Sequence, residues 1–180
     1  MKLWSNFLGY QAVWFCAVIG AGGDLWWPAV AATIVFAAWQ FTVSAQRGSD
    51  LRLLGVALAC GCVVDGVLAT SGLARYAADA PALPPGGAPL WILSLWASFS
   101  LTLNSSQGYL RGRPWAAFIL GAIGGPLAYA GAARGWQALE FAAPAWHGLA
   151  WLACAWAAAM PLLATLARRW SVAPAATELG

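Results

Sequence analysis

Six apolar stretches, each close to the roughly 20 residues that a helix needs to cross the ~30 Å hydrocarbon core of a bilayer, constrain this sequence most strongly. They cover residues 3–20, 26–43, 53–73, 90–107, 115–133 and 145–167. Because lipid offers no partners to backbone polar groups, each stretch is expected to be a helix. We therefore predict an all-α fold, a polytopic membrane protein built as a bundle of six transmembrane helices.

Composition supports this assignment and removes several functions. Of the 180 residues, 62% are hydrophobic and only 8% are charged, which is far too few charges for a water-soluble domain. The net charge of +3 is too small and too dispersed for a nucleic-acid surface, so membrane lipid is the expected partner. The four cysteines all lie inside apolar stretches, and we expect no disulfide, metal site or cofactor. One transmembrane domain covers residues 1–180, with 168–180 as a short cytoplasmic tail.

The distribution of basic residues predicts the orientation. Cytoplasmic loops of membrane proteins carry an excess of lysine and arginine. Seven of the nine basic residues lie on the side of the N-terminus, and two lie on the other side. The seven are Lys2, Arg47, Arg52, Arg111, Arg113, Arg168 and Arg169, and the two are Arg75 and Arg134. Both termini are therefore expected in the cytoplasm.

The first apolar stretch also has the features of a signal peptide, since a basic residue precedes it and small residues follow it. This alternative predicts cleavage near residues 20–23 and only five remaining spans. Asn6, Tyr10 and Gln11 make the stretch unusually polar for such a segment. A transmembrane helix is the preferred interpretation.

Asp65 is the acid that falls within a predicted span, and an intramembrane acid is a functional candidate because its burial is energetically costly. Gly61, one turn before it, leaves room for a partner to approach. Judged by depth, Ser98, Tyr129 and His147 lie near the same level, and Ser98 is the expected direct partner. These four side chains form a candidate ligand-binding cluster in the outer half of the bundle. The alternative for each of them is a structural role in helix packing.

A second polar group lies in the half of the bundle nearer the cytoplasm. Its members are Asn6, Tyr10, Gln11, Gln40 and Asn104. Several amides at one depth are tolerated when they bond to one another or line a wet pocket. We predict a cavity that opens toward the cytoplasm, with a purely structural role as the equal alternative.

The fifth stretch carries Gly121 and Gly125 in a GxxxG pattern, which is typical of close helix packing. Pro126 follows directly and is expected to interrupt the helix.

Several segments resemble a family of small bacterial inner-membrane proteins of unknown function. The resemblance begins with the pattern N-x-x-x-Y-Q-x-x-W-F in the first stretch and includes the intramembrane Asp65. It continues through residues 95–99 and 102–104 and through the G-P-L-A-Y-A-G run of residues 125–131. Because genes of the resembled family often neighbour lipid-modification genes, the resemblance implies the inner (cytoplasmic) membrane of a bacterium and a link to lipid. It supplies no catalytic residues.

Three functional hypotheses follow. The first is a protein that binds a small amphipathic or lipidic ligand in an intramembrane polar pocket and acts in envelope lipid metabolism. The second is a transport component similar in size and topology to the substrate-binding subunits of vitamin-uptake transporters, with Ala17 and Ala21 available to dock a partner. The third is a lipid-modifying enzyme that uses Asp65, Tyr129 and His147. No catalytic motif appears in the sequence, so a role other than catalysis is favoured.

Overall fold

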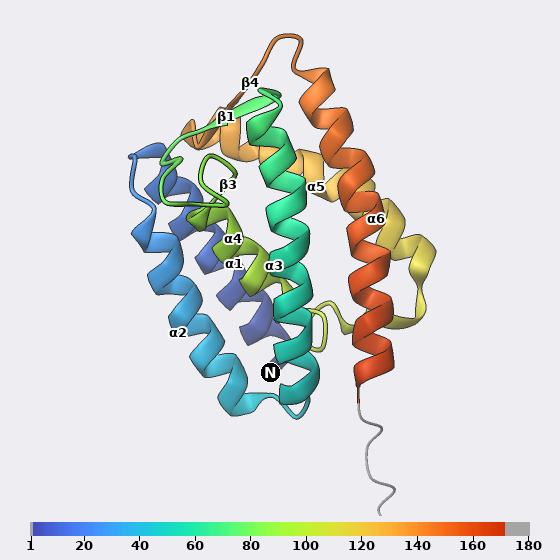
Figure 1. Ribbon diagram of the computed structural model, residues 1–180. Helices are drawn as coiled ribbons and strands as arrows, with labels where there is room; N and C mark the ends of the chain where they lie inside the picture. Colours follow the sequence, from blue (N-terminus) through green and yellow to red (C-terminus); the bar gives the residue numbers. More distant parts are fainter. Residues whose placement is uncertain (1, 172–180) are drawn as a thin grey trace, which may run out of the picture.

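The computed structural model describes residues 2–171 and is predominantly helical over that range (Figure 1). Its six α-helices are α1 (Lys2–Gly22), α2 (Trp27–Val43), α3 (Arg47–Thr70), α4 (Leu90–Ser100), α5 (Pro114–Trp136) and α6 (Trp146–Trp170). Shorter elements are β1 (Ala74–Tyr76), β2 (Ala82–Leu83), β3 (Ala88–Pro89), the 3-10 helix η1 (Gly108–Gly112) and β4 (Leu139–Phe141). The all-α class is confirmed. Of the predicted tail, residues 168–170 belong to α6, and residues 172–180 lie outside the described residues.

Three of these helices, α3, α5 and α6, are long and apolar enough to cross a membrane. Of the others, α2 and α4 are apolar but shorter, with 17 and 11 residues. Helix α1 has 21 residues, but it carries Asn6, Tyr10 and Gln11, which reduce its hydropathy. Length and composition therefore identify three candidate spans among the described helices rather than the six that the sequence predicts.

The fourth predicted span, residues 90–107, is helical only as far as Ser100, which corrects the prediction. From Leu101 the backbone turns irregularly, and the N–H groups of Leu101 and Thr102 donate to carbonyls three residues earlier, at 3.2 and 2.9 Å. Two side chains bond to local carbonyls in competition with a regular helix: Ser100 Oγ donates to Ala97 O at 2.7 Å, and Thr102 Oγ1 donates to Phe99 O at 2.6 Å. We call residues 101–107 the broken segment of α4.

The helices run back and forth between two ends of the bundle. In Figure 1 the start of α1 and the end of α6 lie at the lower end, which we call the terminal end. The opposite end, which we call the loop end, carries the antiparallel pair of β1 and β4, in which Arg75 faces Glu140. Side chains of β1 alternate between buried and exposed, so Tyr76 points into the bundle. This pairing places a tyrosine directly above α3.

The closest helix contact joins α5 and α6 through the two glycines of the GxxxG pattern. A Cβ at Gly121 would lie 2.2 Å from the carbonyl oxygen of Trp156, and a Cβ at Gly125 would lie 2.5 Å from the Trp156 ring. The predicted packing role of both glycines is confirmed. The predicted interruption at Pro126 is wrong, because α5 continues through it. A proline removes one helix hydrogen bond without ending a helix that its neighbours hold in place.

The substitution Gly121→Ala is expected to destabilise the protein by about 1–3 kcal/mol, because the new methyl group overlaps a backbone carbonyl that cannot rotate away. Gly131→Ala, on the same helix but with open space around its Cβ, is the matched control and should be neutral or stabilising by up to about 1 kcal/mol. Unfolding in mixed detergent micelles measures both. Equal stabilities for the two variants would contradict the packing role of Gly121.

Candidate functional site

Asp65 lies on α3 and is completely buried. Helix α3 ends five residues later at Thr70, which puts the carboxylate roughly 8 Å below the loop end of the helix. A carboxylate buried at this depth requires hydrogen-bond donors, because it has lost its water shell. The side chains around Asp65 therefore define the candidate site.

Three donors converge on this carboxylate. Tyr76 Oη and Tyr129 Oη each donate to Asp65 Oδ1 at 2.6 Å, and Trp96 Nε1 donates to Asp65 Oδ2 at 2.6 Å. Burial raises the pKa of Tyr76 well above its usual value, and the charge of Asp65 raises it further, so this phenol stays protonated and able to donate. Both carboxylate oxygens are occupied, and the three donors come from the β1 segment, α4 and α5.

Gly61 explains how Trp96 reaches the acid. A Cβ at Gly61 would lie 2.6 Å from Cδ1 of the Trp96 ring, so a larger residue one turn before Asp65 would displace the indole. The Trp96 ring also stacks on Trp156 of α6, with ring centroids 4.2 Å apart and an angle of 14° between the planes. The acid therefore orients an aromatic pair in the middle of the bundle.

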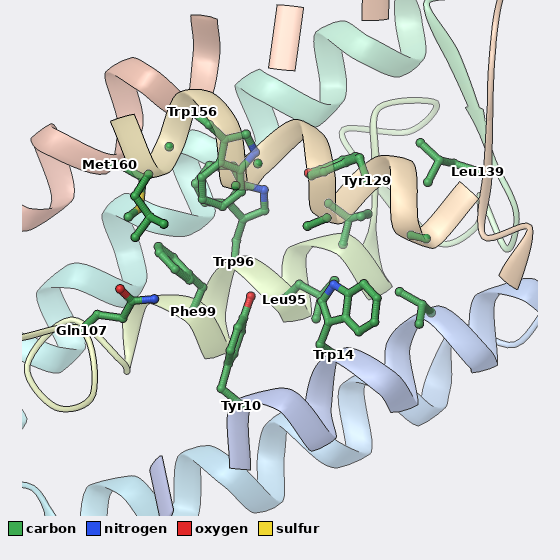
Figure 2. Close-up of a pocket in the computed structure, with 18 of the residues that line it drawn as sticks. Tyr10, Trp14, Leu95, Trp96, Phe99, Gln107, Tyr129, Leu139, Trp156 and Met160 are labelled. Carbon is green, nitrogen blue, oxygen red and sulfur yellow. The ribbon is translucent and has the colours of Figure 1, made fainter. Parts of the chain in front are cut away.

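This pair forms one wall of a cavity of about 210 Å³ between α1, α4, α5 and α6, shown in Figure 2. We call it the aromatic cavity because seven aromatic side chains line it. They are Tyr10, Trp14, Trp91, Trp96, Phe99, Tyr129 and Trp156. The remaining lining is mostly small or aliphatic, with Gly121, Gly124 and Gly125 opening the α5 side. Sites for drug-sized ligands occupy roughly 300–1,000 Å³, so this cavity admits a small molecule or one end of a longer one.

The outer cluster predicted from depth is only partly assembled. Tyr129 contacts Asp65 as predicted. Ser98 does not, and the expected direct bond is wrong: its hydroxyl lies 2.9 Å from Thr33 Oγ1 of α2, on a different face of α4. His147 is also outside the cluster, because its side chain is exposed and its ring lies against Trp146, with centroids 3.9 Å apart. Residues at the same depth in the bundle can face different directions around their helix axes, so depth alone does not establish a contact.

The amides nearer the terminal end bond to one another and to the broken segment of α4. Asn6 is fully buried, and its Nδ2 donates to Gln40 Oε1 at 2.9 Å and to Leu101 O at 3.3 Å. Its Oδ1 accepts a 2.6 Å bond from Ser106 Oγ. For Asn6 and Gln40 the predicted open cavity is therefore wrong, because these side chains satisfy irregular backbone inside the bundle.

Asn104 belongs to a separate group that contains a second fully buried acid, Asp50. Asn104 Nδ2 donates to Asp50 Oδ1 at 2.8 Å and to Ser49 Oγ at 2.9 Å, and Ser44 Oγ donates to Asp50 Oδ2 at 2.5 Å. Arg111 Nη1 donates to Asn104 Oδ1 at 3.3 Å. The sequence placed Asp50 in a loop, whereas α3 begins at Arg47 and carries it into the bundle.

Tyr10 and Gln11 take no part in these bonded groups. Gln11 is half-buried on α1 and does not line the aromatic cavity. Tyr10 packs edge-on against Phe99, with centroids 5.9 Å apart, and its hydroxyl points into the aromatic cavity toward Trp96 (Figure 2). One of the predicted inner residues therefore faces a cavity, but a different cavity from the one expected.

Sequence reasoning missed Trp96 and Tyr76, two of the three partners of Asp65. In the sequence Trp96 is a tryptophan within the apolar stretch 90–107, away from the membrane interfaces that this residue prefers. The glycine one turn before Asp65 was the available signal for a bulky partner. Nothing in the sequence indicated Tyr76, because its approach depends on the pairing of β1 with β4.

Residues 3–162 match the family described as "Protein of unknown function (DUF2878)". The chain belongs to this family. Comparison with curated proteins and with solved structures finds no match. The matched range contains the whole aromatic cavity and all four members of the Asp65 network. Within residues 2–171 the structure brings together no group of three or more histidine, cysteine, aspartate or glutamate side chains that could hold a metal ion.

Tyr129→Phe is expected to lower the free energy of unfolding by about 1.5–3 kcal/mol, because it removes one hydrogen bond to a buried charged group. Tyr109→Phe, at a tyrosine that is 56% exposed, is the matched control and should change stability little. The measurement is unfolding in mixed detergent micelles.

The same measurement on Asp65→Asn and on the double variant tests whether the groups act together. Because Asp65 and Tyr129 share one bond, the two effects should not add. Fully additive effects would show that the bond contributes nothing to stability.

Proposed function

We propose that this member of the family is an integral protein of a bacterial inner membrane that crosses the bilayer six times, with both termini in the cytoplasm. The positions of the start of α1 and the end of α6 at the same end of the bundle support an even number of crossings (Figure 1). Helix α4, its broken segment and η1 together carry the chain from the loop end back toward the terminal end. Large apolar side chains are exposed on α1 and α2 as well as on the long helices. Examples are Leu8, Ile19, Ile34, Val35, Val63, Ile123 and Leu127.

Reporter fusions test this topology. A phosphatase that folds only outside the cytoplasm should be active when it is fused within the loop at residues 80–87 and inactive when it is fused after Trp170. A fluorescent protein that matures only in the cytoplasm should give the opposite pattern. Activity of the same reporter at both positions would rule out the six-span topology.

We further propose that the protein binds a small amphipathic molecule from the bilayer in the aromatic cavity and acts in envelope lipid metabolism. The cavity itself carries this proposal: it is a mostly apolar space in the middle of the bundle, of the kind that small-molecule sites use. Exposed parts of its α5 wall, Leu120 and Ala128, connect it with the outer surface of the bundle. The link to lipid metabolism rests on the resemblance to a family whose genes lie near lipid-modification genes.

In this proposal Asp65 is a positioning residue. Its carboxylate oxygens are taken by Tyr76, Tyr129 and Trp96, and it does not line the cavity itself. Tyr129 and Trp96 do line it, and the acid fixes the orientation of both rings. A fixed aromatic wall loses little conformational entropy when a ligand binds.

No specific observation favours the transport or the enzyme hypothesis. Ala17 and Ala21 are fully buried in the bundle, so they are not available to dock a partner. The exposed position of His147, away from the Asp65 network, removes the acid-base group that an enzyme of the proposed type requires.

Filling the cavity tests the proposed function. Gly124 lines the cavity, and the nearest atom to a Cβ there is a leucine methyl group at 3.7 Å, so Gly124→Leu should occupy the ligand space without a backbone clash. Gly131→Leu, where the Cβ meets open space, is the matched control. Native mass spectrometry of protein extracted in mild detergent should show a retained small molecule with the wild type and the control, and little or none with Gly124→Leu. Equal retention by all three proteins, or none by the wild type, would refute binding in this cavity.

A further inference from the structure

The terminal end of the bundle carries positive charge that no described carboxylate neutralises. Six arginines lie at this end: Arg47, Arg52, Arg111, Arg113, Arg168 and Arg169. Within residues 2–171 none of the six forms an ion pair with an acid. The acid at this end of the described chain is Asp50, which is fully buried and accepts bonds from Asn104 and Ser44 on its two oxygens. The described surface at the terminal end is therefore basic.

Two of these arginines come together where α3 meets α6. The start of α3 lies next to the end of α6, and the two helices are in contact (Figure 1). The guanidinium carbon of Arg52 on α3 lies 6.0 Å from the centroid of the Trp170 ring on α6. Arg169 directly precedes Trp170, and both arginines are exposed. The contact with Trp170 thus places Arg52 and Arg169 at one level of the bundle, on two neighbouring helices.

The hydrogen-bond donors of this pair are not used by the fold. Arg47 Nη2 donates to Thr42 O at 3.1 Å, and Arg111 Nε donates to Gly108 O at 3.2 Å, so these side chains are tied to local backbone. Arg52 and Arg169 make no hydrogen bond to any group within residues 2–171. Each guanidinium therefore keeps five N–H donors available for a partner from outside the described chain.

The exposed surface that continues from the two arginines is apolar on both helices. Ala59 and Val63 follow Arg52 by about two and three helical turns and share its face of α3, and both are exposed. Leu162 precedes Arg169 by about two turns on the same face of α6, and it is 48% exposed. Both helices are long and apolar enough to cross a membrane. We call the surface formed by these five residues the α3–α6 seam.

The seam combines the two features that a phospholipid requires. Guanidinium groups bind phosphate with charge-assisted and often bidentate hydrogen bonds, and exposed apolar side chains accept an acyl chain. The charge at this end also selects between headgroups. The ammonium group of a zwitterionic headgroup would find no free acid among the described residues, whereas an acidic headgroup needs only the basic side chains. The seam therefore fits a lipid with net negative charge.

On this basis we propose that the α3–α6 seam binds an acidic phospholipid of the surrounding bilayer. Its phosphate bonds to Arg52 and Arg169, and an acyl chain lies along Val63 and Leu162. The Trp170 ring holds the Arg52 guanidinium in place through a cation–π contact. The seam lies outside the aromatic cavity, so this site goes beyond the function proposed above. It rests on α3 and α6 as membrane-spanning helices and not on the cavity.

Two lipids with identical acyl chains test the headgroup. Phosphatidylglycerol and phosphatidylethanolamine each carry one phosphate, but only the first has a net negative charge at neutral pH. Each is titrated into the wild-type protein in a neutral detergent, and native mass spectrometry counts the bound lipid. Phosphatidylglycerol should bind about tenfold more tightly, because basic side chains near a membrane surface favour the acidic headgroup.

Variants assign the binding to the seam. Arg52→Gln and Arg169→Gln should each weaken the binding of phosphatidylglycerol about fivefold, and the double variant should bind both lipids equally. Arg168→Gln is the matched control, because it removes the same charge from the same turn of α6. Each helical residue turns by about 100°, so Arg168 lies about 200° from Trp170 and faces away from α3. This control should bind as the wild type does.

The outcomes separate this site from the alternatives. Equal binding of both lipids by the wild type would overturn the acidic headgroup, and this comparison needs no variant to fold. An equal loss in Arg168→Gln and Arg169→Gln would show a diffuse attraction to the basic end and overturn the seam. Gly124→Leu, which fills the aromatic cavity, should leave the binding of phosphatidylglycerol unchanged. A loss in that variant would place the lipid in the cavity and refute the seam.

Discussion

One buried carboxylate ties together the parts of the chain that enclose the middle of the bundle. Asp65 accepts hydrogen bonds from Tyr76 in the β1 segment, from Trp96 on α4 and from Tyr129 on α5, each at 2.6 Å. A charge without water is destabilising unless donors surround it, so the position of each donor is constrained by the same group. The chain segments that carry these donors must keep their places relative to α3 for the acid to stay satisfied.

The same constraint shapes the aromatic cavity. Trp96 and Tyr129 donate their polar hydrogens to the acid and line the cavity, and Trp156, which also lines it, stacks on Trp96. Gly61 and Gly125 allow these rings to come close, since a Cβ at either position would lie within 2.6 Å of an indole atom. The hydrogen bonds to Asp65 thus fix the positions of aromatic rings that form the apolar lining of the cavity.

The helices could be predicted from the apolar runs of the sequence. Asp65 could be identified as a candidate from the same runs, because the energetic cost of an acid in an apolar stretch is visible in the sequence itself. The end of α4 at Ser100 was not predictable from hydropathy, since it depends on hydroxyls such as that of Thr102 competing for backbone carbonyls. Ser98 and His147 were matched to Asp65 by depth alone. The rotation of each helix, which decides contact, is set by packing between segments far apart in the chain, and single-sequence periodicity does not determine it.

Polar side chains inside this bundle fall into two physical classes, and the difference separates structure from function. Asn6 is costly to bury, but it bonds to the carbonyl of Leu101 and to Ser106 and so makes irregular backbone tolerable inside the bundle. This structural role accounts for the burial of Asn6. Gln107 Oε1 and Trp156 Nε1 are buried without a hydrogen-bond partner among the described residues, and both residues line the aromatic cavity. Since folding gains nothing from leaving these two atoms unpaired, they mark the surroundings of the aromatic cavity as the part of the bundle that packing alone does not explain.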